Sequence, residues 1–273
     1  MAAFGSPTRD RAPAVHPTAL VDRRAEISDG VRIGAFCIVE AGVSIGPGTT
    51  LETGSQLLTG ASVGAGNLIG PYAILGGAPM DLKFQGEPSR LFVGDNNRIR
   101  EFSTLHRATG EGEATRVGSG NFIMAYVHVT HNCTVGDGNV IANNAQIAGH
   151  VDVGDHVTFG GSVAVHQYCR IGSGAMLGMH SKVARDVPPF TLADGHPAQL
   201  YGLNVIGLRR AGLTAVERWW LQETLRLYRN RLDWRGVLEL APEIPQLRAL
   251  VSFLASPSKR GSAAFAGRGE PLA

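Results

Sequence analysis

Aliphatic side chains recur at every sixth position over most of this chain. The pattern holds one phase for long stretches and is interrupted twice. The series run from Val15 to Leu75, from Val93 to Leu105 and from Val117 to Val183, with breaks at Met80 and over residues 110–116. A period of six fits neither an α-helix, which repeats at 3.6 residues, nor an alternating strand.

A six-residue period is typical of a parallel β-helix. Its short strands turn aliphatic residues inward, and glycine or asparagine takes the tight corners. In the left-handed form, three hexads of about 18 residues complete one triangular coil. We therefore predict a mainly β chain, with a left-handed parallel β-helix of hexapeptide repeats over residues 15–190.

The hexads stop after Pro188, and helical patterns follow. Thr214 and Glu217 have the spacing of a capping box and predict an amphipathic helix that ends at about Arg231. Further helical patterns cover residues 233–240 and 245–254. We predict a C-terminal α-helical domain over residues 191–256, with disordered segments at residues 1–14 and 257–273.

Composition narrows the classes of function. The net charge of +2 over 273 residues argues against a nucleic-acid binder. Because the chain has neither a signal peptide nor a long apolar run, we expect a cytoplasmic protein without membrane insertion. Cys37, Cys133 and Cys169 share one inward-facing hexad position and have no CxxC spacing. They are predicted to be core residues rather than disulfide or zinc ligands.

Histidines gather where successive coils should stack. His131, His150 and His166 occur in hexads about 18 residues apart, so we expect them on one face, outward of the aliphatic core, with His128 around the corner. One imidazole could act as a general base while the others bind a ligand. Three imidazoles on adjacent coils could instead bind zinc, as in a hexapeptide-repeat carbonic anhydrase. A purely structural β-helix is a third interpretation, which the interrupting loop and the helical domain disfavour.

Six segments carry a family resemblance. They are DLKFQGEPSR (81–90), NRIRE with LHR (97–101 and 105–107), HVTHNCTVG (128–136), NNAQIAGH (143–150), AVHQYCRIG (164–172) and GLNVIGLRR (202–210). In this order and spacing the chain resembles the UDP-N-acetylglucosamine O-acyltransferases of lipid A biosynthesis. The N-acyltransferase of the same pathway is an alternative, but it normally carries a nucleotide-binding domain before its β-helix, where this chain has only 14 residues.

The resemblance implies a reaction, partners and site residues. A 3-hydroxyacyl chain would pass from acyl carrier protein to the glucosamine 3-position of UDP-N-acetylglucosamine, in the first step of lipid A biosynthesis. It implies a homotrimer with sites between neighbouring β-helices, no metal or other cofactor and no covalent acyl-enzyme. His131 matches the general base, and the Gly149 amide matches the oxyanion stabiliser. The matching substrate contacts are Asp81, Lys83, His128, His150, His166, Gln167, Asn204 and Arg210.

Two positions depart from the family pattern. Asn132 follows the base where the best-known members have aspartate, and an amide can orient an imidazole but cannot stabilise imidazolium with a full charge. A 3-amino analogue of the nucleotide sugar therefore stays open as the acceptor. Met179 replaces a glycine of members that accept long chains, at the position that measures the acyl chain. It predicts a shorter chain, of about ten carbons rather than about fourteen.

Overall fold

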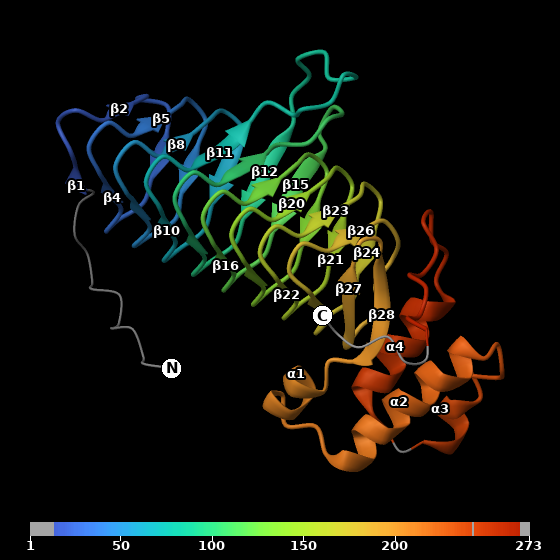
Figure 1. Cartoon of the computed structure of the whole chain (residues 1–273). Helices are drawn as coiled ribbons and strands as arrows, with labels where there is room; N and C mark the ends of the chain where they lie inside the picture. Colours follow the sequence, from blue (N-terminus) through green and yellow to red (C-terminus); the bar gives the residue numbers. More distant parts are fainter. Residues whose placement is uncertain (1–13, 242, 268–273) are drawn as a thin grey trace.

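The fold is a parallel β-helix followed by a helical region (Figure 1). The computed structural model describes residues 14–241 and 243–267. Apart from Ala14, the N-terminal segment predicted to be disordered lies outside the described residues, as do residues 268–273. The β-helix of hexapeptide repeats with a C-terminal helical region is confirmed.

Three sheets form the sides of the coil, and up to β26 each takes every third strand. The eleven-stranded sheet contains β1 (Ala14–Val15), β4 (Arg32–Ile33), β7 (Thr50–Leu51), β10 (Leu68–Ile69), β13 (Arg98–Ile99), β16 (Phe122–Ile123), β19 (Val140–Ile141), β22 (Thr158–Phe159), β25 (Met176–Leu177), β27 (Thr191–Gly195) and β28 (Ala198–Leu203). The nine-stranded sheet contains β2 (Leu20–Val21), β5 (Ile38–Val39), β8 (Gln56–Leu57), β11 (Ile74–Gly77), β14 (Thr104–His106), β17 (His128–Val129), β20 (Gln146–Ile147), β23 (Ala164–Val165) and β26 (Lys182–Val183). The eight-stranded sheet contains β3 (Glu26–Ile27), β6 (Ser44–Ile45), β9 (Ala61–Val63), β12 (Arg90–Val93), β15 (Ala114–Val117), β18 (Thr134–Val135), β21 (Asp152–Val153) and β24 (Arg170–Ile171).

The aliphatic period follows directly from this architecture. Val129, Ile147 and Val165 pair in register across three successive coils and are all buried. Each coil repeats this arrangement on three sides, so an inward aliphatic is needed at every sixth residue. The three cysteines are free and fully buried in the same core, as predicted.

Both interruptions of the period are loops that leave the same corner. The buried asparagines Asn67, Asn97, Asn121 and Asn139 form a ladder in which successive members are 30, 24 and 18 residues apart. The extra residues form loops between β11 and β12 and between β14 and β15. Both loops join the nine-stranded to the eight-stranded sheet, and we call the turns and loops between these two sheets the loop corner. The first loop ends earlier than the break in the hexads suggests, because β12 already pairs with β9 and β15.

The helical region begins later than predicted. Residues 191–203 are not helical, because β27 extends the eleven-stranded sheet and turns back as the antiparallel strand β28. Within residues 204–241 and 243–267 four helices follow: α1 (Val205–Arg210), α2 (Ala215–Arg229), α3 (Val237–Leu240) and α4 (Pro245–Ala255). Thr214 and Glu217 form the predicted capping box at the start of α2. Among the described residues, every helix is too short or too polar to cross a bilayer.

The segment after α4 is ordered over residues 257–267, contrary to the predicted disorder. Asp186 donates its backbone N–H to the oxygen of Gly261 and accepts from Ala263. Leu200 makes a similar pair of bonds with residues 264 and 266. Ala263 is buried, so the small residues that suggested disorder are those that allow close packing against the last coil. We call residues 257–267 the C-terminal segment.

Candidate active site

The loop corner stacks the central histidines on successive coils. His131 and Gly149 occupy equivalent turn positions one coil apart, and Asn132 and His150 occupy the next positions. The backbone N–H of His150 donates to the oxygen of His131 at 3.1 Å. Asn132 has a φ of 58° and His150 a φ of 59°, so the corner turns through the left-handed region at both positions. The backbone thereby directs the side chains of adjacent coils toward one another.

A hydrogen-bond network determines the tautomer of His131. The Asn132 side-chain amide donates to the oxygen of Thr109 at 3.0 Å, and its oxygen accepts from the Thr109 N–H at 2.9 Å. These two bonds orient the amide, so its oxygen faces Nδ1 of His131, 2.9 Å away. That oxygen can only accept, so Nδ1 of neutral His131 carries the proton. The lone pair of His131 therefore lies on Nε2.

Gly149 lies directly against the free edge of this imidazole. A β-carbon built at Gly149 would lie 2.6 Å from Cε1 and 2.7 Å from Nε2 of His131. The backbone N–H of Gly149 donates to no group among the described residues. The missing side chain allows the ring to approach, and the residue that it approaches has an unused amide donor.

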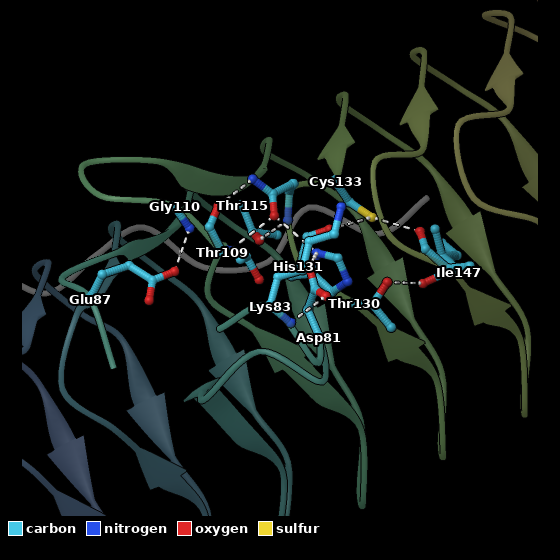
Figure 2. Close-up of polar contacts among 12 residues, drawn as sticks. Asp81, Lys83, Glu87, Thr109, Gly110, Thr115, Thr130, His131, Cys133 and Ile147 are labelled. Carbon is cyan, nitrogen blue, oxygen red and sulfur yellow. Dashed lines mark hydrogen bonds and ion pairs between the residues drawn. The ribbon is translucent and has the colours of Figure 1, made fainter. Parts of the chain in front are cut away.

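Asp81 brings a negative charge to the other side of the ring. Its Oδ2 lies 4.0 Å from Nδ1 of His131, and Figure 2 shows how Asp81 and Thr109, from the two loops, lie beside the histidine. The hydrogen bond from the Lys83 amide chiefly holds the pKa of Asp81 below its usual range, and the His131 and Lys83 charges and Thr109 act in the same direction. The Lys83 side chain itself is exposed. The loops cover His131, which is outward of the core but only 8% exposed.

A second histidine pair lies one coil before the first. His106 and His128 meet edge to face, with ring centroids 5.0 Å apart. Nδ1 of His106 donates to the oxygen of Ala78 at 2.6 Å, and Nδ1 of His128 lies 2.6 Å from Oγ1 of Thr104. Burial is the main cause that lowers the pKa of both histidines. The charge of His131 also lowers the pKa of His106, against the bond to Ala78, and the charge of His106 lowers that of His128. The two rings are thus neutral groups at neutral pH.

Comparison with known proteins decides between the interpretations that the sequence left open. A family model described as UDP N-acetylglucosamine O-acyltransferase, domain 2, matches residues 186–263, and a bacterial hexapeptide transferase model matches residues 114–149. The acyl-(acyl-carrier-protein)–UDP-N-acetylglucosamine O-acyltransferase of Alkalilimnicola ehrlichii is 46% identical over 258 residues, covering 90% of this chain and 98% of the relative. The chain belongs to this O-acyltransferase family.

Solved structures agree with that assignment. The UDP-N-acetylglucosamine O-acyltransferase of Moraxella catarrhalis superposes with a TM-score of 0.87 at 40% identity, covering 91% of this chain and 99% of the other. The homologue from Acinetobacter baumannii gives 0.86 at 37% identity, with the same coverage. The carbonic anhydrase and N-acyltransferase interpretations receive no support from these matches. Within residues 14–241 and 243–267, no three His, Cys, Asp or Glu side chains are arranged as a metal site.

Three residues that the family resemblance assigns to substrate lie away from the loop corner of the same chain. Met179 follows β25 on the corner between the eleven-stranded and nine-stranded sheets and is 67% exposed. Asn204 caps α1, accepting from Gly207 and donating to the oxygen of Gly174, which accounts for its side chain without a ligand. Arg210 is exposed at the end of α1. Their roles in this acyltransferase stay predictions.

The C-terminal segment reaches the loop corner through residues that the sequence did not indicate. Arg260 donates Nε–H to the backbone oxygen of Gln167 at 2.8 Å and lies 2.6 Å from Nδ1 of His166. The Lys259 ammonium lies 4.3 Å from the centroid of the Tyr168 ring. No periodicity marks these contacts, since Arg260 and Gln167 are 93 residues apart. A cavity of about 320 Å³ opens here, and it is lined by Asn132, His150, Asp152, Tyr168, Arg170 and residues 257–259.

Proposed function

We propose that this acyltransferase moves a 3-hydroxyacyl chain from acyl carrier protein to the 3-hydroxyl of UDP-N-acetylglucosamine by general base catalysis at His131. The chain is an acyl-(acyl-carrier-protein)–UDP-N-acetylglucosamine O-acyltransferase of lipid A biosynthesis. The observation that carries the mechanism is the Asn132 hydrogen bond to Nδ1 of His131, which leaves Nε2 free to take a proton.

The reaction is a direct transfer with one tetrahedral intermediate. Nε2 of His131 removes the proton of the sugar 3-hydroxyl as the oxygen attacks the thioester carbonyl. The Gly149 N–H donates to the oxyanion, and the nearby Asp81 carboxylate stabilises the imidazolium. The intermediate then expels the carrier protein's thiolate, which takes the proton back from His131. The products are the 3-O-acyl sugar nucleotide and free carrier thiol.

A covalent acyl-enzyme is unnecessary, and the nearby side chains are poorly placed to form one. Cys133 is fully buried, and burial raises the pKa of its thiol to about 11. The Thr130 hydroxyl donates to the oxygen of Ile147. Among the described residues, neither group is hydrogen-bonded to the His131 imidazole, because the Cys133 thiol contacts the backbone oxygens of His131 and Ala148. No activated nucleophile therefore competes with the sugar hydroxyl.

Sharing of the site between copies of the chain accounts for its dispersed residues. Met179, Asn204 and Arg210 lie away from the loop corner of their own chain. In a homotrimer of parallel prisms, different corners of neighbouring copies face one another. We propose that Met179 of one copy limits the acyl groove beside His131 of the next. Lys83, His128, His150, His166 and Gln167 would then contact the substrates from the His131 side.

Product mass tests the proposed reaction. The purified chain is incubated with UDP-N-acetylglucosamine or its 3-amino analogue and a set of 3-hydroxyacyl carrier proteins of different length. We expect an O-acylated sugar nucleotide with the wild type, and loss of turnover in His131→Ala and His131→Gln with the thermal unfolding midpoint retained. Turnover in either variant, an acyl adduct on the enzyme, or a product only from the 3-amino sugar would overturn the proposal.

A further inference from the structure

Tyr168 contacts both neighbours of the proposed base. Its ring lies parallel to that of His150, with centroids 4.6 Å apart and planes at 11°. His150 in turn meets His131 edge to face, with centroids 5.3 Å apart. The backbone N–H of Tyr168 also donates to the oxygen of Gly149 at 3.2 Å. One residue on the coil beyond His150 therefore supports the His150 ring and the Gly149 peptide together.

The C-terminal segment holds Tyr168 from outside the coil. Lys259 places its ammonium over the aromatic ring, a favourable cation–π arrangement. Arg260 donates hydrogen bonds to the two residues that precede Tyr168 in sequence. One bond goes to the ring Nδ1 of His166, which must accept because a guanidinium only donates, and the other goes to the backbone oxygen of Gln167. Gly261, the next residue of the segment, accepts a hydrogen bond from the backbone N–H of Asp186. Asp186 is fully buried, and its carboxylate accepts from Arg170. The two cations are thus anchored rather than loose.

We propose that Tyr168, held by Lys259 and Arg260, is a positioning residue for the acyl transfer, because it keeps His150 and the Gly149 peptide in place against His131. This inference rests on the proposed function of His131 and Gly149. The positions of His131 and the Gly149 peptide must be accurate to less than an ångström, because His131 removes the proton in the same step in which the Gly149 N–H donates to the oxyanion. A stacked ring restrains the tilt of His150 without making a directed bond to it.

Tyr168 also affects the protonation of His150 by covering its ring. Burial lowers the pKa of His150, as do the charges of His131, Lys259 and Lys83, while Asp81 acts in the opposite direction. The charged groups around the ring are therefore His131, Asp81, Lys83, Lys259 and, on the following strand, Asp152. A neutral His150 leaves the imidazolium that forms on His131 without a like charge beside it. Uncovering His150 would let it take up a proton at higher pH.

Two substitutions at Tyr168 separate stacking from hydrogen bonding. The Tyr168 hydroxyl makes no hydrogen bond among the described residues. We expect Tyr168→Phe to keep wild-type rates. Tyr168→Leu, which removes the ring but keeps an apolar side chain, should lower kcat about tenfold and change KM less than about twofold. The acid limb of its pH profile should move to higher pH. Wild-type kinetics in Tyr168→Leu, or equal losses in both variants, would overturn the proposal.

Substitution of Lys259 and Arg260, the two cations of the C-terminal segment, tests the same proposal independently. We expect Lys259→Met with Arg260→Met to reproduce the kcat loss of Tyr168→Leu, with at most a small further loss when all three are combined, because the changes act through one ring. Lys182→Met, on the same prism in β26, is a control for charge removal alone. Histidine NMR of the labelled protein should show His150 signals losing the ring-current shift of Tyr168 in the Leu variant. Unchanged His150 signals would contradict the proposed stacking.

The controls keep this inference apart from the proposed function. If His131→Ala retains turnover, the general base assignment fails whatever Tyr168 does. If His131→Ala is inactive while Tyr168→Leu and the double Met variant match the wild type, only the positioning role fails. Thermal unfolding midpoints of all variants exclude loss of fold as the cause.

Discussion

The side-chain oxygen of Asn132 accepts the Nδ1 proton of His131 while both ends of the same amide are bonded to Thr109. The amide thus links the base to the loop between β14 and β15 and holds it in one tautomer. An aspartate at this position would keep the acceptor but lose the donor to the Thr109 oxygen. An aspartate would therefore stabilise the charged form of His131 but weaken the attachment of the loop between β14 and β15.

Substitution of Asn132 tests this double role. We expect Asn132→Ala to lower kcat about 100-fold, because His131 loses its tautomer and orientation. Asn132→Asp should retain much of kcat but lower the free energy of unfolding by about 1–3 kcal/mol, since the Thr109 oxygen loses its donor. Asn144→Ala is the matched control, because Asn144 has a similar φ of 60° on another corner. Steady-state kinetics and urea unfolding measure both effects, and equal activity in Asn132→Ala and wild type would contradict the assignment.

A methyl group at Gly149 should displace the base. Because the added carbon would lie 2.6 Å from Cε1 of His131, the ring must move. We expect Gly149→Ala to lower kcat about 100-fold with the β-helix intact. Gly161→Ala serves as the folding control, since the nearest atom to its added carbon is 3.7 Å away. A crystal structure of the Gly149 variant with His131 unmoved would refute the steric argument.

Removal of the Asp81 charge should slow the chemical step. We expect Asp81→Asn to lower kcat about tenfold with a smaller effect on KM, because the carboxylate 4.0 Å from Nδ1 stabilises the imidazolium in the transition state. Glu87→Gln is the control, since Glu87 is a carboxylate of the same loop whose oxygens accept from backbone N–H groups of residues 85 and 110. Similar losses in both variants would point to loop disorder instead of charge.

The length of the acyl chain tests the role of Met179. We expect Met179→Gly to shift the preference from about ten carbons toward about fourteen, because deleting the exposed side chain lengthens the groove by several methylenes. Competition between carrier proteins charged with chains of different length, read out by product mass, measures the ratio of kcat/KM values. An unchanged ratio means that Met179 does not limit the groove.

Three histidines should make stability fall on mild acidification. Burial holds the pKa of His106, His128 and His150 below the ordinary 6.5, so the unfolded chain binds their protons first. The free energy of unfolding should therefore drop as pH falls below about 6.5, by up to about 1.4 kcal/mol per pH unit for each histidine. Urea unfolding between about pH 7.5 and pH 5.5 measures the slope. His106→Gln should reduce the slope and the exposed His156→Gln should leave it unchanged; the reverse order would disprove the explanation.

Features that repeat with the coil could be predicted from the sequence. Val129, Ile147 and Val165 are buried because each occupies the same place on successive coils, and His131 and Gly149 meet for the same reason. Residues that are 18 apart in sequence lie one above the other on successive coils. Both the buried core and the stacking of His131 on Gly149 follow from this period. The capping box of α2 is equally local.

Contacts that break the period could not be predicted in this way. Thr109 reaches Asn132 because an inserted loop folds back over the corner, and nothing in its composition specifies that direction. Arg260 reaches Gln167 from 93 residues away. The composition of the C-terminal segment predicts disorder because small residues are common in both disordered chains and closely packed ones, whereas Ala263 is buried. Only tertiary packing distinguishes the two.

Insertions at the loop corner leave the ladder of strands in phase. Leu68 pairs with Arg98 and Arg98 with Phe122, although the intervening coils are longer than their neighbours, and the sheets continue without a register shift at these pairs. A coil can therefore vary in length at this corner while the strands on its three sides stay paired with those of the neighbouring coils. The two loops that supply Asp81 and Thr109 to the surroundings of His131 can therefore change in length or sequence without shifting the strands that place His131 and Gly149 one above the other.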